Sequence, residues 1–401
     1  MKTFIYQLRD KKGRSLYGFE RAADKRALRR KIVDKNLFFV SAQKTDRKKI
    51  FRQGISLTAL SVFTHRLSSL VEAGIPILSA LNVLWHQTED KQMQLVISYL
   101  TRRLEQGARI SEAMASFPNV FPPVYRALVG IAEKSGGLVE ILRRLVIYLE
   151  YQRNLIMRTR KAMFYPIVVL VFSLLILIGM FVFVVPVFQR FLEKLNVELP
   201  LLTRAVLNVS AFLRNPFAIA GIFLLIAAGY FVHRYIKSSV SARQVLDRMK
   251  LRIPFYGNIL YTSNMSRFVN AFSLMVGAGL PLLESFQAAA STVDNRSVYK
   301  SIDRVRARVE QGMGLHESFD RERDFPQMMV EMVGIGEQSG KISRSLDRMA
   351  QHFDEDVDYK LNRGLTLLEP ALIVVVGVMV LLTLMAIYLP VVSMWQGLSG
   401  G

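Results

Sequence analysis

The chain contains two copies of one sequence pattern, and this duplication constrains its fold more than any other feature. Gly74–Leu78 returns as residues 279–283, and Gly130–Gly136 returns as residues 334–340. The separation is 205 residues early in the repeat and 204 later, so one deletion aligns the two copies. Each copy ends in a long apolar run, and its length far exceeds that of a solenoid unit. We therefore expect two alike modules, each a polar domain plus a membrane helix, on the same side of a membrane.

The composition fits a membrane protein with substantial aqueous domains. Of 401 residues, 51% are hydrophobic, yet 21% are charged, and the length allows two or three domains. The absence of cysteine excludes disulfides and thiolate metal sites. The five His residues are not near-paired at metal-ligand spacing, which argues against zinc. We expect no cofactor and no metal.

Positive charge is concentrated at the N-terminal end. Residues 1–52 carry 17 Lys or Arg against 5 Asp or Glu, whereas residues 237–365 carry 18 against 16. A basic segment of this kind serves nucleic acid or the anionic cytoplasmic leaflet. We favour the membrane and expect no direct nucleic-acid partner. Because Met1–Arg14 contains no apolar run, we expect no signal peptide and a first domain in the cytoplasm.

Three apolar segments are candidate membrane spans. Residues 164–188 and 370–392 are uncharged runs of 25 and 23 residues, longer than the roughly 20 needed to cross a bilayer. Residues 217–232 form a run of 16, which alone fits either a span or a core helix. If both polar domains lie in the cytoplasm, an even number of spans must separate them, so this run must also cross. Arg214 and Arg234 can snorkel from its two ends.

The expected topology has the N-terminus inside and the C-terminus outside. Lys and Arg residues flank the predicted inner ends of the spans more densely than the outer ends, as the positive-inside rule requires. The spans contain no Asp, Glu, Lys, Arg or His in their cores, so they show no proton relay or ion path. The expected domains are an α+β appendage (1–45), a basic linker (46–55), bundle repeat 1 (56–163), span 1 (164–188), an outer loop (189–215), span 2 (216–235), bundle repeat 2 (236–367), span 3 (368–392) and an outer tail (393–401).

Glycine and proline divide each repeat into short helices. Apolar residues at helical spacing over 58–72 are followed by a glycine suited to end that helix and a proline suited to open the next. Ser111 is the expected N-cap of a short helix through Phe117. Short connections imply antiparallel neighbours, hence an all-α bundle of about six helices in each repeat. The residues singled out as structural or partner-interface candidates are Gly74, Pro76, Gly107, Glu133, Gly136, Pro166, Gly279, Pro281, Gly312, Glu337, Gly340 and Pro370.

Pro166 and Pro370 occupy equivalent positions where the apolar runs begin. Proline is tolerated in the first turn of a helix or kinks a longer one. We favour the kink, because residues 138–163 already have a helical pattern. In the appendage, Phe4, Tyr6 and Leu8 alternate as in a half-buried strand, residues 10–13 suit a turn, and 15–20, 22–35 and 37–40 suit a strand, a helix and a strand.

Three motifs suggest a phosphate loop, acid catalysis and a cation site, but each fits a structural role better. Residues 336–341, Gly-Glu-Gln-Ser-Gly-Lys, lack the glycine spacing of a phosphate loop and fit a turn between helices. Glu133 and Glu337 recur before such turns, where capping, bundle contact or a subunit interface is favoured over acid catalysis. The acidic residues within 354–358 are chemically suited to a divalent cation, but a solvated helix face is the simpler interpretation.

Several of these segments resemble the inner-membrane platform proteins of type II secretion systems and type IV pili, the GspF/PilC family. Leu70–Pro76 and Met275–Pro281 resemble the family's hallmark, and 130–136 with 334–340 resemble its second motif. Tyr165-Pro166 and Glu369-Pro370 resemble its pattern at the start of the spans, and Leu199–Thr203 its outer segment. The appendage departs from the pattern, because Asn36 stands where glycine is common.

The resemblance implies a non-enzymatic platform in the bacterial inner membrane, with an outer loop and tail in the periplasm. It further implies a cytoplasmic assembly ATPase, pilin or pseudopilin subunits, other inner-membrane assembly proteins, anionic lipid and further copies of the chain as partners. The alternative is a transporter or channel component, although no polar stripe lines any span. An enzyme is a third interpretation, although no nucleophile–base pair or nucleotide loop stands out.

Overall fold

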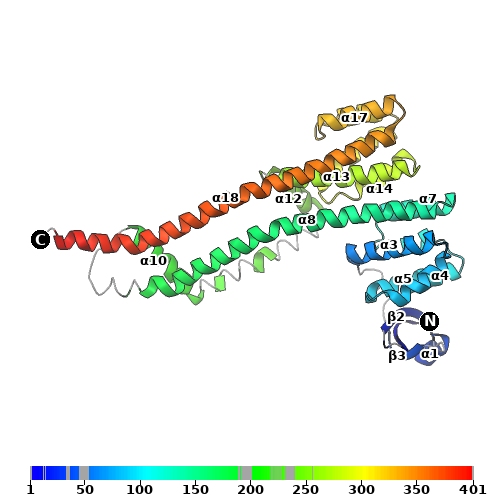
Figure 1. The fold of residues 1–401 in the computed structure, drawn as a ribbon, viewed down its shortest axis with the longest axis horizontal. Coiled ribbons are helices and arrows are strands. Elements are labelled where there is room, and N and C mark those ends of the chain that lie inside the picture. Colours follow the sequence, from blue (N-terminus) through cyan, green and yellow to red (C-terminus); the bar gives the residue numbers. More distant parts are fainter. Residues whose placement is uncertain are drawn as a thin grey trace. The chain divides into compact units, whose positions relative to one another are not determined.

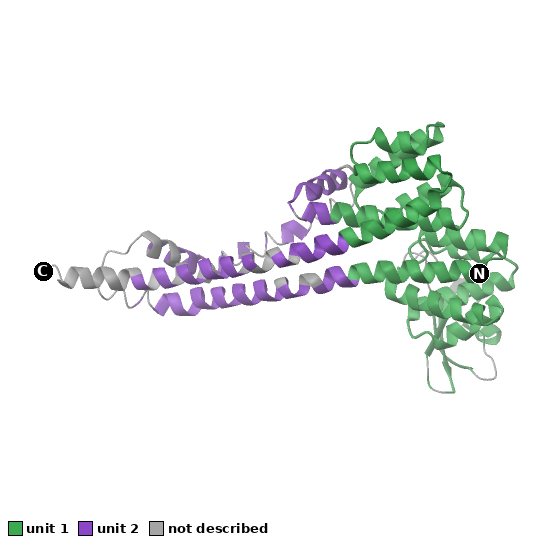
Figure 2. Ribbon diagram, turned by 45° about the horizontal axis from the view of Figure 1, so that its top comes forward, with its two compact units in different colours: residues 1–156, 260–356 green, residues 157–259, 357–401 purple. Residues whose placement is uncertain are grey.

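The chain folds into helices joined to one small sheet, in a computed structural model (Figure 1). Two compact units divide it: unit 1 comprises residues 1–156 and 260–356, and unit 2 comprises residues 157–259 and 357–401 (Figure 2). The residues that the structure describes are 2–11, 13, 15–32, 37–44, 54–187, 190, 201–217, 220–221, 224, 227–230, 240–254 and 256–399.

The N-terminal appendage is a three-stranded antiparallel sheet with one helix. The strands β1 (Lys2–Asp10), β2 (Ser15–Ala22) and β3 (Leu37–Lys44) lie in the order β2-β1-β3, and α1 (Lys25–Ile32) packs on β2. Phe4 and Leu8 are buried, as their alternation predicts. The small α+β fold is therefore confirmed, with β3 four residues longer than predicted. Most of the predicted linker (46–55), namely residues 46–53, lies outside the described residues.

Repeat 1 is a bundle of six helices. They are α3 (Leu57–Glu72), α4 (Ile77–Gln87), α5 (Lys91–Glu105), α6 (Ile110–Ala115), α7 (Pro123–Ser135) and the first part of α8 (Leu138–Gly179). Leu60, Phe63 and Leu67 on α3 are buried, as the periodicity of this segment predicts. Phe63 packs edge-on against Phe121, with 6.3 Å between ring centroids, and this aromatic contact closes the core.

Repeat 2 has a counterpart for each of these helices. They are α13 (Tyr256–Gly277), α14 (Leu282–Ala290), α15 (Arg296–Glu310), α16 (Leu315–Asp320), α17 (Gln327–Gln338) and α18 (Ile342–Ser399). Phe268 and Phe325 stand at the positions of Phe63 and Phe121, and both are in the core. Phe286 and Phe319 lie between them, with centroid spacings of 4.9 to 5.8 Å along the row. The duplicated sequence has thus produced two alike helical modules.

Unit 2 contains the distal parts of the two longest helices. Residues 157–187 of the chain continue α8 into a π-helical turn, η1 (Met180–Val184), and residues 357–399 form the rest of α18. The two segments run side by side in the same direction (Figures 1 and 2). Pro166 and Pro370 lie inside these helices, which continue past them. Unit 2 also contains α10 (Leu201–Arg214) and α12 (Val240–Arg252).

One stretch among the described residues is long and apolar enough to cross a membrane. It is Ile167–Val187, with a mean hydropathy of 3.3 and no part of its most apolar window buried in the chain. Much of predicted span 2 lies outside the described residues, and predicted span 3 lies within α18. The three crossings and the topology therefore stay predictions, with span 1 as the candidate that the described residues contain.

The predicted outer loop, residues 189–215, contains a helix. The helix α10 occupies its second half and packs against η1, where the Ser210 hydroxyl donates to the Phe181 carbonyl at 2.6 Å. A π-helical turn weakens the regular ladder of backbone bonds, so a side-chain donor at this point is stabilising. Residues 201–214 of this segment are therefore helical, and its place outside the membrane stays a prediction.

Candidate functional site

The glycine turns of both repeats gather at one end of unit 1, which we call the turn end. Gly74, Gly107 and Gly136 in repeat 1 and Gly279, Gly312 and Gly340 in repeat 2 all have φ between 66° and 91°. In repeat 1 an ion pair ties two of these turns together. Glu72, beside Gly74, pairs with Arg143 at 2.8 Å, only a few residues after Gly136. From the turn end, residues 138–156 of α8 extend away for about 27 Å at 1.5 Å per residue.

The same backbone motif ends α3 and α13. The Gly74 amide donates to the Val71 carbonyl at 3.0 Å, and the Ile75 amide donates to Leu70 at 3.1 Å. Gly279 and the residue after it repeat these two bonds at 3.0 Å each. This is a Schellman cap, which requires a left-handed residue at the glycine position and satisfies carbonyls that the helix leaves unpaired. Pro76 and Pro281 then stand immediately before the next helix, each with extended ψ near 140°.

Glu133 and Glu337 cap a neighbouring helix in each repeat. The Glu133 carboxylate accepts from the Ile110 amide at 2.5 Å and the Ser111 amide at 3.2 Å, at the start of α6. Glu337 accepts from the Leu315 and His316 amides at 2.6 and 2.8 Å, at the start of α16. A carboxylate at a helix N-terminus satisfies exposed amides and complements the helix dipole. Of the interpretations open from sequence, the structure shows capping.

The predicted N-cap of the short helix was wrong. The cap position of α6 is Arg109, whose side chain makes no capping bond, and Ser111 lies one residue inside the helix. The Ser111 hydroxyl instead donates to Glu133, the same carboxylate that accepts the backbone amides. The cap is supplied by a glutamate 22 residues away and not by a local serine. Sequence spacing alone does not show that α7 lies across the start of α6.

At the other end of unit 1, a chain of polar contacts links α8 with α13 and α18. The Tyr151 hydroxyl on α8 hydrogen-bonds the Ser266 hydroxyl on α13. Ser266 donates to Asp354 Oδ1 on α18 at 2.7 Å, and Asn270 donates to the same oxygen at 2.8 Å. Burial raises the pKa of Tyr151, so it stays protonated and able to donate. We call these four residues the polar seam.

Two residues of the predicted acidic cluster at 354–358 make contacts with neighbouring helices. Asp354 belongs to the polar seam, and in unit 2 Asp358 pairs with Arg158. Within the described part of the chain, no three His, Asp or Glu side chains form a group that could hold a metal ion. Asp354 and Asp358 therefore serve contacts between helices, whereas Glu355 is exposed on a solvated face.

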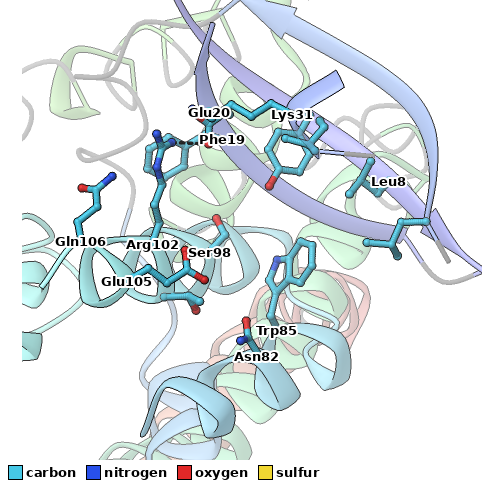
Figure 3. A pocket seen from close by; sticks show the side chains of 14 residues that line it. Leu8, Phe19, Glu20, Lys31, Asn82, Trp85, Ser98, Arg102, Glu105 and Gln106 are labelled. Atoms are coloured by element: carbon cyan, nitrogen blue, oxygen red, sulfur yellow. Dashed lines mark hydrogen bonds and ion pairs between the residues drawn. The ribbon is translucent and has the colours of Figure 1, made fainter. Parts of the chain in front are cut away.

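The appendage is held against repeat 1 by side chains that sequence reasoning missed. The buried Gln94 of α5 accepts from the Tyr17 amide at 3.0 Å, and Trp85 of α4 donates to the Tyr17 carbonyl at 2.8 Å. Arg102 of α5 pairs with the buried Glu20 of β2 at 2.5 Å (Figure 3). A solitary buried glutamine in an otherwise apolar helix face was the one available sequence signal.

An open cavity of about 440 Å³ lies along this contact (Figure 3). Phe19 and Trp85 line its apolar part, whereas Arg102 and Glu105 line its polar part. Glu20 accepts ion pairs from both Lys31 and Arg102, so the charges at its rim are largely paired within the chain. The cavity separates the appendage from α4 and α5 on one side while Tyr17 and Gln94 join them on the other.

These features define a class: a duplicated helical protein whose modules extend by long helices toward a candidate membrane span. Residues 63–186 and 268–390 both match the family described as type II secretion system (T2SS), protein F, so each repeat is one copy of that domain. The chain belongs to this family, which confirms the resemblance to GspF/PilC proteins.

Curated relatives of full length support the same assignment. The chain is 30% identical to the type IV pilus assembly protein PilC of Thermus thermophilus, with all of both chains covered. It is 30% identical to PilC of Pseudomonas aeruginosa, over 86% of this chain and 94% of the relative. It is also 28% identical to the type II secretion system protein F of Vibrio cholerae, over 98% of each.

Proposed function

We propose that this chain is the inner-membrane platform on which a cytoplasmic assembly ATPase drives pilin or pseudopilin subunits out of the bilayer and into a filament. The family is one of non-enzymatic assembly platforms, and its relatives are named for type IV pilus assembly and type II secretion. Both kinds of relative match at 28 to 30% identity. The proposal therefore names the step that the two machines share.

The observation that carries the proposal is that exposed polar turns lie at one end of unit 1, from which two long helices extend. The turn end of unit 1 presents short loops and exposed polar side chains, whereas α8 and α18 leave it as uninterrupted helices of 42 and 58 residues. A continuous helix keeps its backbone hydrogen bonds internal and transmits displacement along its axis better than a loop does. The polar seam joins both helices to α13. Movement imposed at the turn end would thus reach both stems together.

The proposed topology has both repeats in the cytoplasm and the segment 189–215 and the C-terminal tail in the periplasm. In unit 2 the distal parts of α8 and α18 run in the same direction, as two spans leaving the same compartment must (Figure 2). A return crossing near 216–235 is then required between them. The apolar side chains exposed on residues 164–187 and on 373–388 would face lipid and the apolar stem of a pilin.

The turn end offers exposed cations to an acidic surface of the ATPase. Lys134 lies two residues before Gly136, and Lys341 directly follows Gly340. Both lysine side chains are exposed. Within the described residues neither makes an ion pair. Complementary charge at such a rim accelerates and orients association. The appendage carries a second basic surface, Arg29, Arg30 and Lys31 in the last turn of α1, which suits anionic lipid of the inner leaflet.

Co-purification of the ATPase with the full-length chain tests this assignment. The chain would be expressed in its source cell, and the assembly ATPase of that cell would be quantified after solubilisation. Joint reversal by Lys134→Glu and Lys341→Glu should lower the recovered ATPase by about tenfold. The matched control is Arg248→Glu with Arg252→Glu, two exposed cations of α12.

Three results decide the matter. Loss of ATPase in the turn-end variant alone, with unchanged membrane levels of the chain, supports the proposal. Equal recovery from all three chains removes the turn end as the contact. Pilus formation or secretion that persists in a strain lacking the chain would remove the platform function itself.

A further inference from the structure

One contact between the repeats has no equivalent within the chain. Helix α7 of repeat 1 packs against α14 of repeat 2. By the alignment of the repeats, α7 corresponds to α17 and α14 corresponds to α4. A two-fold relation between the repeats would therefore also place α17 against α4. Instead, α17 and α4 lie apart, on opposite sides of the α7–α14 pair (Figure 1). The contact between the repeats is thus heterologous, and one surface of each kind is left over.

The leftover surface on α17 is apolar. On α7, Val124 and Leu128 are fully buried and Ile131 is half-buried, and these three positions form one stripe of the helix. The corresponding residues of α17 are Met328, Met332 and Ile335. The two methionines are only half-buried, and Ile335 is 64% exposed. The neighbouring stripe of α17, with Met329 and Val333, is buried just as its counterpart on α7 is.

We propose that the stripe Met328–Met332–Ile335 binds α4 of a second copy of this chain, in the way that α7 binds α14 within one copy. The occupant follows from the repeat, because α4 is the helix that corresponds to α14. The equivalent contact, between α7 and α14, already exists once in the molecule. An exposed apolar stripe that is chemically conserved between the two repeats, but covered in only one, marks an interface. This inference goes beyond the proposed function and does not rest on it.

The geometry also limits the assembly that results. Each copy offers one α17 surface and one α4 surface, so copies join head to tail. Both repeats send their long helices in the same direction, so successive copies would be related by rotation about an axis along those helices (Figures 1 and 2). If that rotation closes, the copies form a ring of lobes in which repeats 1 and 2 alternate. A ring of this kind contains an even number of lobes.

Cysteine cross-linking tests the contact directly, because the chain has no cysteine of its own. Two differently tagged full-length chains would be co-expressed, one with Ile335→Cys and the other with Ser79→Cys, an exposed position of α4. The intrachain control is Ile131→Cys with Glu284→Cys in one chain, the corresponding pair on α7 and α14. The shortest bis-maleimide that joins the control pair should also join the two tagged chains. A chain with Val62→Cys, an exposed position of α3, should give no product with Ile335→Cys.

A second variant measures the strength of the association. Ile335→Glu should raise the dissociation constant for self-association of the chain in nanodiscs by about tenfold or more, because a largely apolar contact would have to bury a carboxylate. Val62→Glu, a matched change at a 40% exposed valine, should change it by less than about twofold. Equal thermal stability of the two variants separates a lost interface from a lost fold.

The proposal is overturned by either of two results. One is the absence of product between the 335 and 79 positions with the linker that joins the intrachain control. The other is self-association that Ile335→Glu leaves unchanged, including the case in which this variant loses only the ATPase, which would make α17 a surface for that partner.

Discussion

Removing the carboxylate of Glu133 should loosen helix α6 while leaving the rest of repeat 1 intact. Glu133 accepts the Ile110 and Ser111 amides as well as the Ser111 hydroxyl, and Ile110 is only 3% exposed. The Glu133→Ala change therefore strands buried donors at the start of the helix. Because no other side chain caps α6, neighbouring groups cannot take over the bonds without moving α7.

The magnitude follows from two independent estimates. Loss of an N-cap acceptor costs about 0.5–2 kcal/mol. Hydrogen bonds to a charged group contribute about 1.5–3 kcal/mol each, part of which water restores when the helix opens. We take about 2–3 kcal/mol for the local opening of α6, which corresponds to about 30-fold to 150-fold faster exchange of its amides.

Hydrogen–deuterium exchange of the full-length chain in detergent, read out by mass spectrometry over residues 108–117, measures this opening. Glu133→Gln keeps one acceptor oxygen but no charge, so its exchange should lie between those of the wild type and Glu133→Ala. Glu331→Ala is the matched control, because Glu331 accepts only an exposed Gln327 side chain. Exchange of 108–117 within twofold of the wild type in Glu133→Ala would refute the capping role.

Three further changes test other parts of the structure. Gly279→Ala should lower the melting temperature through a cost of about 1–2 kcal/mol, because its φ of 85° is left-handed; an unchanged melting temperature would contradict the cap. Hydrogen bonds from Arg304, partly opposed by burial, hold the pKa of Glu322 below its ordinary value. The ion pair therefore stabilises the fold above the unfolded-state pKa of Glu322, and this stabilisation is lost as pH falls through the folded-state pKa. Glu322→Gln should make the melting temperature depend less on pH between about pH 6 and 3. Tyr151→Phe and Asp354→Asn should each destabilise the chain by about 1–2 kcal/mol and be non-additive in a double-mutant cycle, since both act through Ser266; strict additivity would disconnect the seam.

The duplication made most of the helical architecture predictable from the sequence. Gly74 and Gly279 occur at matching positions between helical patterns, and a glycine followed by proline permits few local structures. The alternation of Phe4, Tyr6 and Leu8 likewise predicted β1. These signals are local, so they survive without knowledge of which helices are neighbours.

Contacts between distant segments were not predictable in the same way. Glu133 caps a helix that begins 23 residues earlier, and Gln94 binds a strand 77 residues away. Leu128 is buried and Met332 only half-buried, although their positions in the repeat are the same. Sequence periodicity shows that a face is apolar, but only the tertiary arrangement shows what covers it.

The central claim is that the two repeats lie in the same compartment and share stems into the membrane. Single cysteines at Gln311 in repeat 2, Gln43 in the appendage and Asn208 in α10 are exposed reporters in a cysteine-free chain. In intact spheroplasts, a membrane-impermeant maleimide should label the Asn208→Cys chain, and should label Gln43→Cys and Gln311→Cys only after lysis. Labelling of Gln311→Cys from outside, with Gln43→Cys protected, would place the repeats on opposite sides of the membrane and contradict the account.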